Sequence, residues 1–321
     1  MLLTAIPGIL VMNCAKITDD FRVCSPPPGA ALDSFPSLLS ETGLYTDIST
    51  HNIGPGVEAY TPRFQLWSDG AQKSRWIMLP AGQKIDTQDS EVWSFPMGTR
   101  FWKEFRVDGR RVETRLLRKT AGDDRSWIGV SYIWNDDGTD AYKAEWGGIN
   151  VNGTQHNVPA AAECMGCHGG RQNRILGFSA TQLSGDAGEI TVAEAIEREW
   201  LSHPPTPLLP LPGNEIELAA LGYLHANCSH CHNSDRPNDD KQRCFNPKKD
   251  FSFLLTSEGH VDETETYQTA IGKVIERGDA SGSRVIREME KRGYHQGMPP
   301  LGTETVDRQG VETVGRWIDA L

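Results

Sequence analysis

Cys164-Met165-Gly166-Cys167-His168 and Cys228-Ser229-His230-Cys231-His232 are two copies of one pattern, Cys-x-x-Cys-His. Its two thiols lie one helical turn apart, so each can form a thioether to a haem vinyl group while the adjacent histidine ligates the iron. The two copies predict two haem c groups, with His168 and His232 as proximal iron ligands. The expected thioether carriers are Cys164, Cys167, Cys228 and Cys231.

Two other kinds of site use closely spaced cysteines. A closed zinc site of four cysteines also takes two Cys-x-x-Cys pairs, but it does not need a histidine directly after each second cysteine. A thioredoxin-like dithiol lies at the start of a helix in a βαβ unit, and neither copy has that sequence context. The motifs therefore favour haem, with zinc as the main alternative.

Composition limits the class of protein and its partners. The 321 residues are enough for two domains or three small ones, and contents of 38% hydrophobic and 23% charged residues are typical of a soluble globular protein. The formal net charge of −11 and the lack of a Lys/Arg run exclude nucleic acid as the expected partner. A basic protein redox partner, steered by charge, fits better.

The N-terminal sequence bears on location. Residues 1–12 form an apolar run that lacks a basic n-region and is too short to span a bilayer, so we expect either the remnant of an export signal or an ordinary terminus. Val11-Met12-Asn13-Cys14 is similar to a lipoprotein cleavage box, although Asn13 stands where a small residue is expected. Cys14 is thus a candidate lipid anchor. Haem attachment takes place outside the bacterial cytoplasm, which predicts a periplasmic protein or an outer-membrane or cell-surface lipoprotein.

The remaining cysteines suggest a disulfide. Four thioether carriers among seven cysteines leave Cys14, Cys24 and Cys244. In an oxidising compartment two of these should pair. We favour Cys24 with Cys244, which leaves Cys14 for lipidation or removal; the alternative is Cys14 with Cys24.

The predicted fold class is α+β, in four segments. Residues 1–59 hold the signal remnant and an extended arm, and residues 60–150 a Trp-rich antiparallel β domain, either a sandwich or an open barrel. Residues 151–213 contain the first haem segment and a Pro-rich connector. Residues 214–321 are expected to form an all-α cytochrome c domain with the second haem.

The strand prediction starts from Asp108-Gly109, which favours a tight type I′ hairpin between Arg100–Val107 and Arg111–Lys119. A further strand is expected over Ser126–Asn135. The region contains seven tryptophans, which form either a core, a stacking surface for a sugar or an aromatic ligand, or a wall against a haem. Alternation along the strands favours the core. The seven tryptophans are Trp67, Trp76, Trp93, Trp102, Trp127, Trp134 and Trp146.

Helices are predicted by apolar spacing and by capping residues. We expect a short helix within 34–45 and helices over 191–200, 214–228 and 307–321. Asn214 followed by Glu217 is a helix N-terminal signature. Residues 202–213 contain five prolines and should form a semi-rigid connector.

The distal iron ligands are harder to predict. Met298 precedes two prolines that hold its loop rigid, so we expect it to ligate the iron of haem 2, although a buried methionine is more often core filler. Ligation by His and Met raises the reduction potential of that haem. For haem 1 the leading candidate is His225, and the alternatives are His156, His203 and Met97.

Several stretches resemble a bacterial family of dihaem c-type cytochromes whose role is itself poorly defined. Tyr223–Cys228, Arg277–Asp279 and Met298–Gly302 are similar to the cytochrome c domain of this family. Phe64–Ala71 and Tyr132–Asp136 are similar to its N-terminal part, and the resemblance covers roughly residues 20–320. It implies an exported dihaem electron carrier and names no substrate.

Three functions follow from this sequence, in order of preference. The first is electron transfer between redox partners through both haems. The second is a dihaem peroxidase or oxidase-like enzyme in which haem 1 keeps an open coordination position. The third is a redox partner of a polysaccharide-active oxidase, with the Trp-rich domain binding the sugar.

Overall fold

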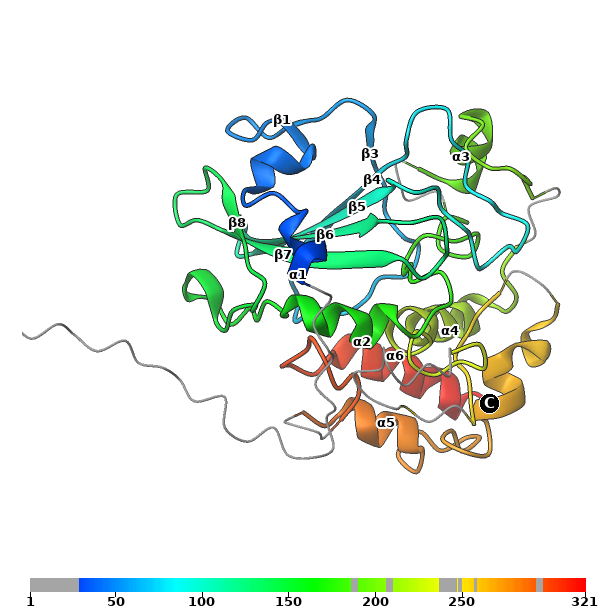
Figure 1. Ribbon diagram of the computed structural model, residues 1–321. Coiled ribbons are helices and arrows are strands. Elements are labelled where there is room, and N and C mark those ends of the chain that lie inside the picture. Colours follow the sequence, from blue (N-terminus) through cyan, green and yellow to red (C-terminus); the bar gives the residue numbers. More distant parts are fainter. Residues whose placement is uncertain are drawn as a thin grey trace, which may run out of the picture.

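The computed structural model describes residues 29–185, 190–205, 210–236, 247, 250–256, 259–292 and 297–321. Cys14, Cys24 and Cys244, and with them the predicted lipid anchor and disulfide, lie outside these residues. The fold is mixed: every named strand lies between Tyr45 and Lys143, and the long helices follow later in the chain (Figure 1). None of the helices in the described part is long and apolar enough to cross a membrane.

Six strands form one antiparallel sheet in chain order, which confirms the predicted antiparallel β domain. They are β3 (Val57–Ala59), β4 (Gln72–Met78), β5 (Arg100–Val107), β6 (Arg110–Lys119), β7 (Trp127–Trp134) and β8 (Ala141–Lys143). β1 (Tyr45–Asp47) and β2 (Asn52–Ile53) pair in a separate ribbon. The end strands β3 and β8 do not pair with each other, so the sheet is open, and it is covered on both faces as in a sandwich-like domain.

The β5–β6 hairpin forms at the predicted turn. Val107 pairs with Arg110, and both Asp108 (φ 50°) and Gly109 (φ 78°) have positive φ, as a type I′ turn requires. A bulge next to Phe105 then shifts the register by one residue. This shift decides which side chains of the two strands lie opposite each other further along the sheet.

One face of the sheet is covered by the arm that precedes it. Trp102, Leu116 and Val130 pack there against an apolar cluster that includes Phe35, Leu39 and Leu44 from the arm. The core interpretation of the tryptophans is confirmed for five of the seven, Trp76, Trp93, Trp102, Trp127 and Trp134, which are at most 9% exposed. Trp146 is different, because it is 88% exposed.

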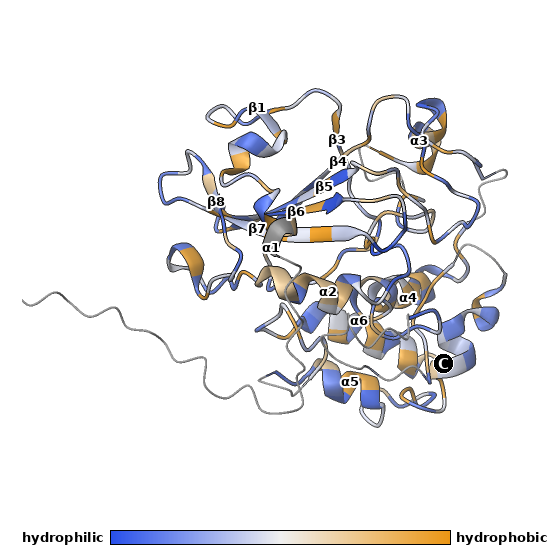
Figure 2. Ribbon diagram, in the orientation of Figure 1, coloured by the Kyte–Doolittle hydropathy of each residue, from blue (hydrophilic) through white to orange (hydrophobic). Residues whose placement is uncertain are grey.

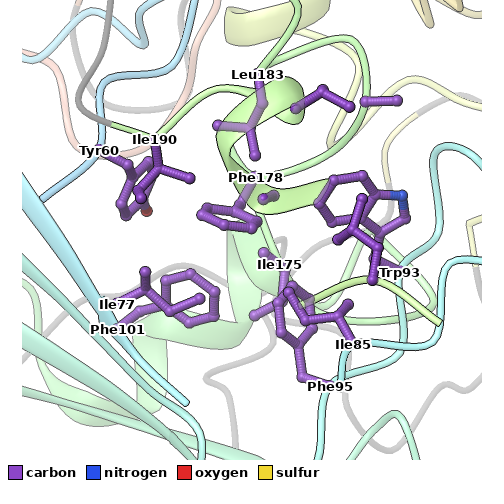
Figure 3. Close-up of a cluster of buried hydrophobic side chains, with 14 of the residues drawn as sticks. Tyr60, Ile77, Ile85, Trp93, Phe95, Phe101, Ile175, Phe178, Leu183 and Ile190 are labelled. Atoms are coloured by element: carbon purple, nitrogen blue, oxygen red, sulfur yellow. The ribbon is translucent and has the colours of Figure 1, made fainter. Parts of the chain in front are cut away.

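The other face packs against the segment that follows the first motif. Phe178 makes edge contacts with Tyr60 and Trp93, at ring-centroid distances of 4.9 and 5.8 Å (Figure 3). α3 (Val192–Glu197) joins the same cluster and begins at the Thr191 cap, whose side chain accepts from the Glu194 amide. The first motif is therefore held by the core of the sheet.

The short helix predicted within 34–45 is present as a 3₁₀ helix rather than an α-helix. α1 (Gly29–Asp33) ends before this segment, because the residue before Pro36 is disfavoured in the helical region. A single 3₁₀ turn, η1 (Leu39–Thr42), follows, and β1 begins at Tyr45. The apolar residues of the arm are buried as expected, but in an irregular segment.

The helices of the C-terminal part begin where their capping residues predict. The Asn214 side chain accepts from the Ile216 and Glu217 amides at the start of α4 (Glu215–Asn227), and Asp307 caps α6 (Arg308–Asp319) through the Gly310 amide. α4, α5 (Arg284–Met289) and α6 share an apolar cluster. Figure 2 shows that α5 and α6 carry both hydrophobic and hydrophilic residues, as expected of helices with one buried face.

Short turns complete the described fold. The 3₁₀ turns η2 (Val151–Gly153) and η3 (Ala161–Glu163) lead into α2 (Cys164–His168), which holds the first motif. η5 (Val261–Glu263) and the π-helical turn η6 (Thr266–Ala270) connect α4 to α5. In Figure 1, α2, α4, α5 and α6 gather on one side of the sheet.

Candidate functional site

The first motif lies directly against the sheet. Its helix α2 packs on β7, where a Cβ built at Gly129 would be 3.0 Å from the Cys164 sulfur. A residue with a side chain at position 129 would collide with the thiol. The lack of a side chain there lets the motif approach the strand.

His168 is oriented by the backbone that follows it. Its Nδ1 lies 2.6 Å from the Arg174 carbonyl oxygen, and because a carbonyl only accepts, Nδ1 carries the proton and donates. Burial, together with the positive charges of Lys103 and Arg115, lowers the pKa of His168 to about 4 despite this bond. A neutral ring with a proton on Nδ1 leaves the Nε2 lone pair available for a metal, which is the arrangement that outer hydrogen bonds give to metal-binding histidines.

The second motif begins where α4 ends. The Cys228 amide donates to the Leu224 carbonyl at 2.9 Å, and the His232 amide donates to the Cys228 carbonyl at 2.9 Å. The His232 ring stacks on Phe251 with a centroid distance of 4.6 Å and an interplanar angle of 19°. The motif histidine is thus fixed by an aromatic side chain on one of its faces.

One cavity joins the two motifs and the predicted methionine. Its wall includes Cys167 of the first motif, Cys228, Cys231 and His232 of the second, and Met298. The two prolines after Met298 line it as well. The structure therefore brings Met298 to the second motif, although the two segments are far apart in the sequence.

The two motif segments also touch directly. Gly170 lies so close to the His230 carbonyl oxygen that a Cβ at position 170 would overlap it, and the Asn233 amide nitrogen donates to the Gly170 carbonyl at 3.1 Å. The sequence predicts each motif but not this contact, because nothing in either segment encodes its distance from the other.

Sequence reasoning missed His230, which lies between the two cysteines of the second motif. It lines both the shared cavity and a second cavity, whose wall also includes His225 and Arg171. Burial, reinforced by His168 and His232, lowers the pKa of His230 to about 3. The only signal in the sequence is a histidine at an unconstrained position of the motif, so its place between the motifs emerges only in three dimensions.

His225, the leading candidate for the sixth ligand of haem 1, has the opposite hydrogen bond to His168. Its Nδ1 accepts from the Leu255 amide at 3.1 Å, so in the neutral ring the proton lies on Nε2, which then has no lone pair for iron. Its ring lines the second cavity, away from the motif cysteines. A backbone amide thirty positions away therefore sets this tautomer, and the role of His225 as an iron ligand stays a prediction.

The three alternatives for that ligand are placed elsewhere. His156 Nε2 lies 2.8 Å from a Glu113 carboxylate oxygen. His203 is at the surface beside Ser202 and Asp86, and Met97 is 62% exposed. The described structure thus brings none of these three to the motif cavity.

The arrangement of the four thiols bears on the zinc and dithiol alternatives. Within the described ranges, no group of three or more His, Cys, Asp or Glu side chains is arranged to hold a bare metal ion. Burial raises the pKa of Cys164 and of Cys228 to about 12 each, whereas a redox-active dithiol needs a lowered thiol pKa. The raised pKa values of these two thiols do not favour the dithiol alternative.

Comparisons with protein-family models, with curated proteins and with solved structures gave no match to this chain. The residues and their geometry are therefore the basis of the functional proposal.

Proposed function

We propose that this chain is an exported dihaem c-type cytochrome that transfers electrons between protein redox partners. The observation that carries the proposal is the shared cavity, whose wall combines cysteines of both motifs with His232 and Met298. A haem supplies a reversible one-electron couple, and the chain sets its potential through ligands, burial and nearby charge. No side-chain acid or base is needed for this task.

The residues fit such a group by their chemistry. Cys164, Cys167, Cys228 and Cys231 would form the thioethers, and His168 and His232 would be the proximal ligands. The hydrogen bond from His168 Nδ1 to a carbonyl leaves the correct nitrogen for iron. Met298 would supply the sixth ligand of haem 2 and raise its potential.

The proposal extends to the C-terminal part and to location. Residues 214–321 would be the cytochrome c domain, since α4 carries the second motif and α6 packs against α4. The haems would require export, and the formal charge of −11 would attract a basic partner. Peptide mapping without reduction tests the Cys24–Cys244 disulfide, and mass analysis of the N-terminal peptide tests lipidation at Cys14.

The experiment that tests the proposal is production in bacteria able to mature c-type cytochromes, followed by intact mass and visible spectra. We expect the mass of two haems, and the loss of one haem in each of Cys164→Ala/Cys167→Ala and Cys228→Ala/Cys231→Ala. Ser49→Ala, an exposed change far from the motifs in sequence, serves as the control and should keep both haems. A colourless protein of unmodified mass would disprove the function.

A specific observation favours one alternative, a dihaem peroxidase or oxidase-like enzyme. His156 Nε2 contacts Glu113, His203 and Met97 lie at the surface, and His225 Nδ1 accepts from a backbone amide, an arrangement that would leave haem 1 without any of the four predicted sixth ligands. An open coordination position is what such an enzyme requires. A high-spin ferric signal together with turnover of hydrogen peroxide would favour the enzyme, and a fully low-spin protein without turnover would favour the carrier.

A further inference from the structure

Three cations lie side by side across the middle of the sheet. Arg75 on β4 pairs with Lys103 on β5, and Lys103 pairs with Arg115 on β6, so three positive side chains stand directly opposite one another. Lys73 lies two positions before Arg75, on the same face of β4. Like charges directly opposite on neighbouring strands are destabilising, so this cation row, Lys73, Arg75, Lys103 and Arg115, needs a reason.

The cation row faces the first motif. Leu117, two positions after Arg115, pairs with Gly129, and position 129 is where the sheet touches the Cys164 sulfur. The positive charges of Lys103 and Arg115 also act on His168 and on Cys167, which agrees with this placement. The row therefore borders the space into which a group attached to the first motif would extend.

The one carboxylate on this face is already engaged. Glu113 accepts from Arg115 Nε at 2.7 Å and Nη2 at 2.9 Å, from Ser131 at 2.7 Å, and lies 2.8 Å from His156. Both of its oxygens have partners. Glu113 thus pairs with Arg115, and the carboxylates of Asp69 and Asp307 act on Lys73 without forming an ion pair with it. Arg75 and Lys103 are left without a carboxylate partner in the described chain.

Lys73, Arg75 and Lys103 form no ion pair with any carboxylate of the described chain. Lys73 donates to the Leu66 carbonyl at 2.7 Å, and Arg75 reaches only the Gln65 amide oxygen at 3.4 Å. The Lys103 ammonium has no hydrogen bond within the described residues. It lies 4.9 Å from the centroid of the Phe105 ring. Because partly buried cations without an anion are costly, the row is built for a ligand with more than one negative charge.

We propose that the cation row holds the two propionate groups of haem 1. This inference rests on the proposed function, and it names the residues that would position haem 1. The two propionate carboxylates would balance the positive charge of the row that Glu113 does not neutralise. The haem that carries them would be attached at Cys164, which lies at the same face of the sheet. The row would also favour the reduced haem, because positive charge nearby stabilises an added electron.

The test measures the two reduction potentials separately. Lys103→Gln, with Arg75→Gln as a second variant, is compared with Lys84→Gln, which removes the same charge from an exposed loop, and with Lys103→Arg, which keeps the charge. Each protein is titrated potentiometrically after its mass has shown two haems, and haem 2 is identified as the one whose potential changes in Met298→Ala.

We expect Lys103→Gln and Arg75→Gln each to weaken reduction of haem 1 about tenfold, equal to a fall of about 59 mV for one electron, with haem 2 nearly unchanged. Lys84→Gln should leave both potentials in place, and Lys103→Arg should restore that of haem 1. If two haems are present and neither row variant differs from Lys84→Gln, the row has another role while the dihaem function stands.

A soluble anion is the competing occupant. Excess inorganic phosphate should not change the potential of haem 1 in the unaltered protein, because the propionates already fill the row. If phosphate lowers that potential and Lys103→Gln abolishes the effect, the row binds a free anion and the inference is wrong. A protein without haem at the first motif would overturn both the inference and the proposed function.

Discussion

At the scale of single residues, the Glu113 carboxylate is the main counter-charge for the cations on its face of the sheet. It is fully buried and engages Arg115, Ser131 and His156. Burial alone would raise the pKa of Glu113, but the charge of Arg115 and the hydrogen bonds from His156 and Arg115 outweigh it and lower the pKa to about 2. The carboxylate is therefore held in its ionised form.

Glu113→Gln should be strongly destabilising, since it neutralises a fully buried carboxylate and leaves the partly buried Arg115 beside further cations without its counter-charge. Breaking a buried pair in this way costs about 3–5 kcal/mol. Urea unfolding followed by circular dichroism measures the loss. Glu304→Gln, at an exposed site, is the control, and an equal effect of both changes would contradict this role of Glu113.

The same carboxylate predicts an acid limit. Its pKa is about 2 in the folded chain, against 4.5 ordinarily, so the stability it contributes is complete above pH 4.5 and is lost as the pH falls toward 2. Unfolding free energies measured from pH 6 to pH 2 should show this fall in the unaltered protein and a smaller one in Glu113→Gln. If the unfolding free energies of the two proteins fall in parallel with pH, other carboxyl groups cause the acid sensitivity.

Residue identity predicts the orientation of a histidine only where a motif fixes its surroundings. His168 follows its cysteines in sequence, and its local backbone supplies the orienting carbonyl of Arg174. His225 is as buried as a ligand would be, yet its tautomer depends on Leu255, which reaches it only through the tertiary fold. Local chemistry could be predicted from the sequence, and long-range hydrogen bonding could not.

At the scale of elements, capping residues predict where the helices begin. Asn214→Ala removes the acceptor for two amides at the start of α4, the helix that delivers the second motif. We expect a loss of about 1 kcal/mol in unfolding free energy, measured by urea denaturation. Asn214→Asp keeps an accepting oxygen and should remain close to the unaltered protein; if it falls as far as Asn214→Ala, the cap is not the cause.

The strands show where prediction from the sequence ends. The Asp108-Gly109 turn alone sets Lys103 opposite Thr114, whereas the bulge beside Phe105 moves Arg115 into that position. No residue at the bulge signals it in advance, so the sequence predicts the hairpin but not the cation row. The order of the strands and the burial of most tryptophans could be predicted, because they depend on alternation and on turn chemistry rather than on exact register.

At the scale of the whole molecule, one loop of the β part holds the loop that carries Met298. Asp69 accepts from the Glu304 amide at 2.9 Å and from the Thr305 amide at 2.8 Å, and Trp67 Nε1 donates to the Thr305 carbonyl at 3.1 Å. We call these contacts the Asp69 clasp. It ties the segment after Met298 to the connection that leads into β4.

Asp69→Gly should open the clasp without adding strain, because Asp69 has a φ of 51° that glycine adopts readily. We expect faster amide hydrogen exchange at Thr305 and in residues 297–302, with the sheet unchanged. Asp137→Gly is the control, since Asp137 bonds only within its own turn, to Thr139. Unchanged exchange at Thr305 would show that the clasp does not hold the loop.

Gly170→Ala tests the contact between the two motif segments. An added methyl group would overlap the His230 carbonyl, a backbone atom that cannot move aside cheaply. Overpacking of this kind costs about 1–3 kcal/mol, which thermal unfolding detects. Gly122→Ala is the control, because the added methyl group meets open space and should leave the melting temperature nearly unchanged. Similar melting temperatures for the two variants would show that the motif segments lie further apart than described.

The cavity with a wall drawn from both motifs has a consequence for how such a chain can be inherited. Cys167 belongs to the half built on the sheet, and Cys228 and Met298 to the helical half, yet all three border one space. If recombination separated the two halves, each half would lose the part of the cavity wall that the other supplies. A gene encoding this architecture must be passed on, and must diversify, as a single unit.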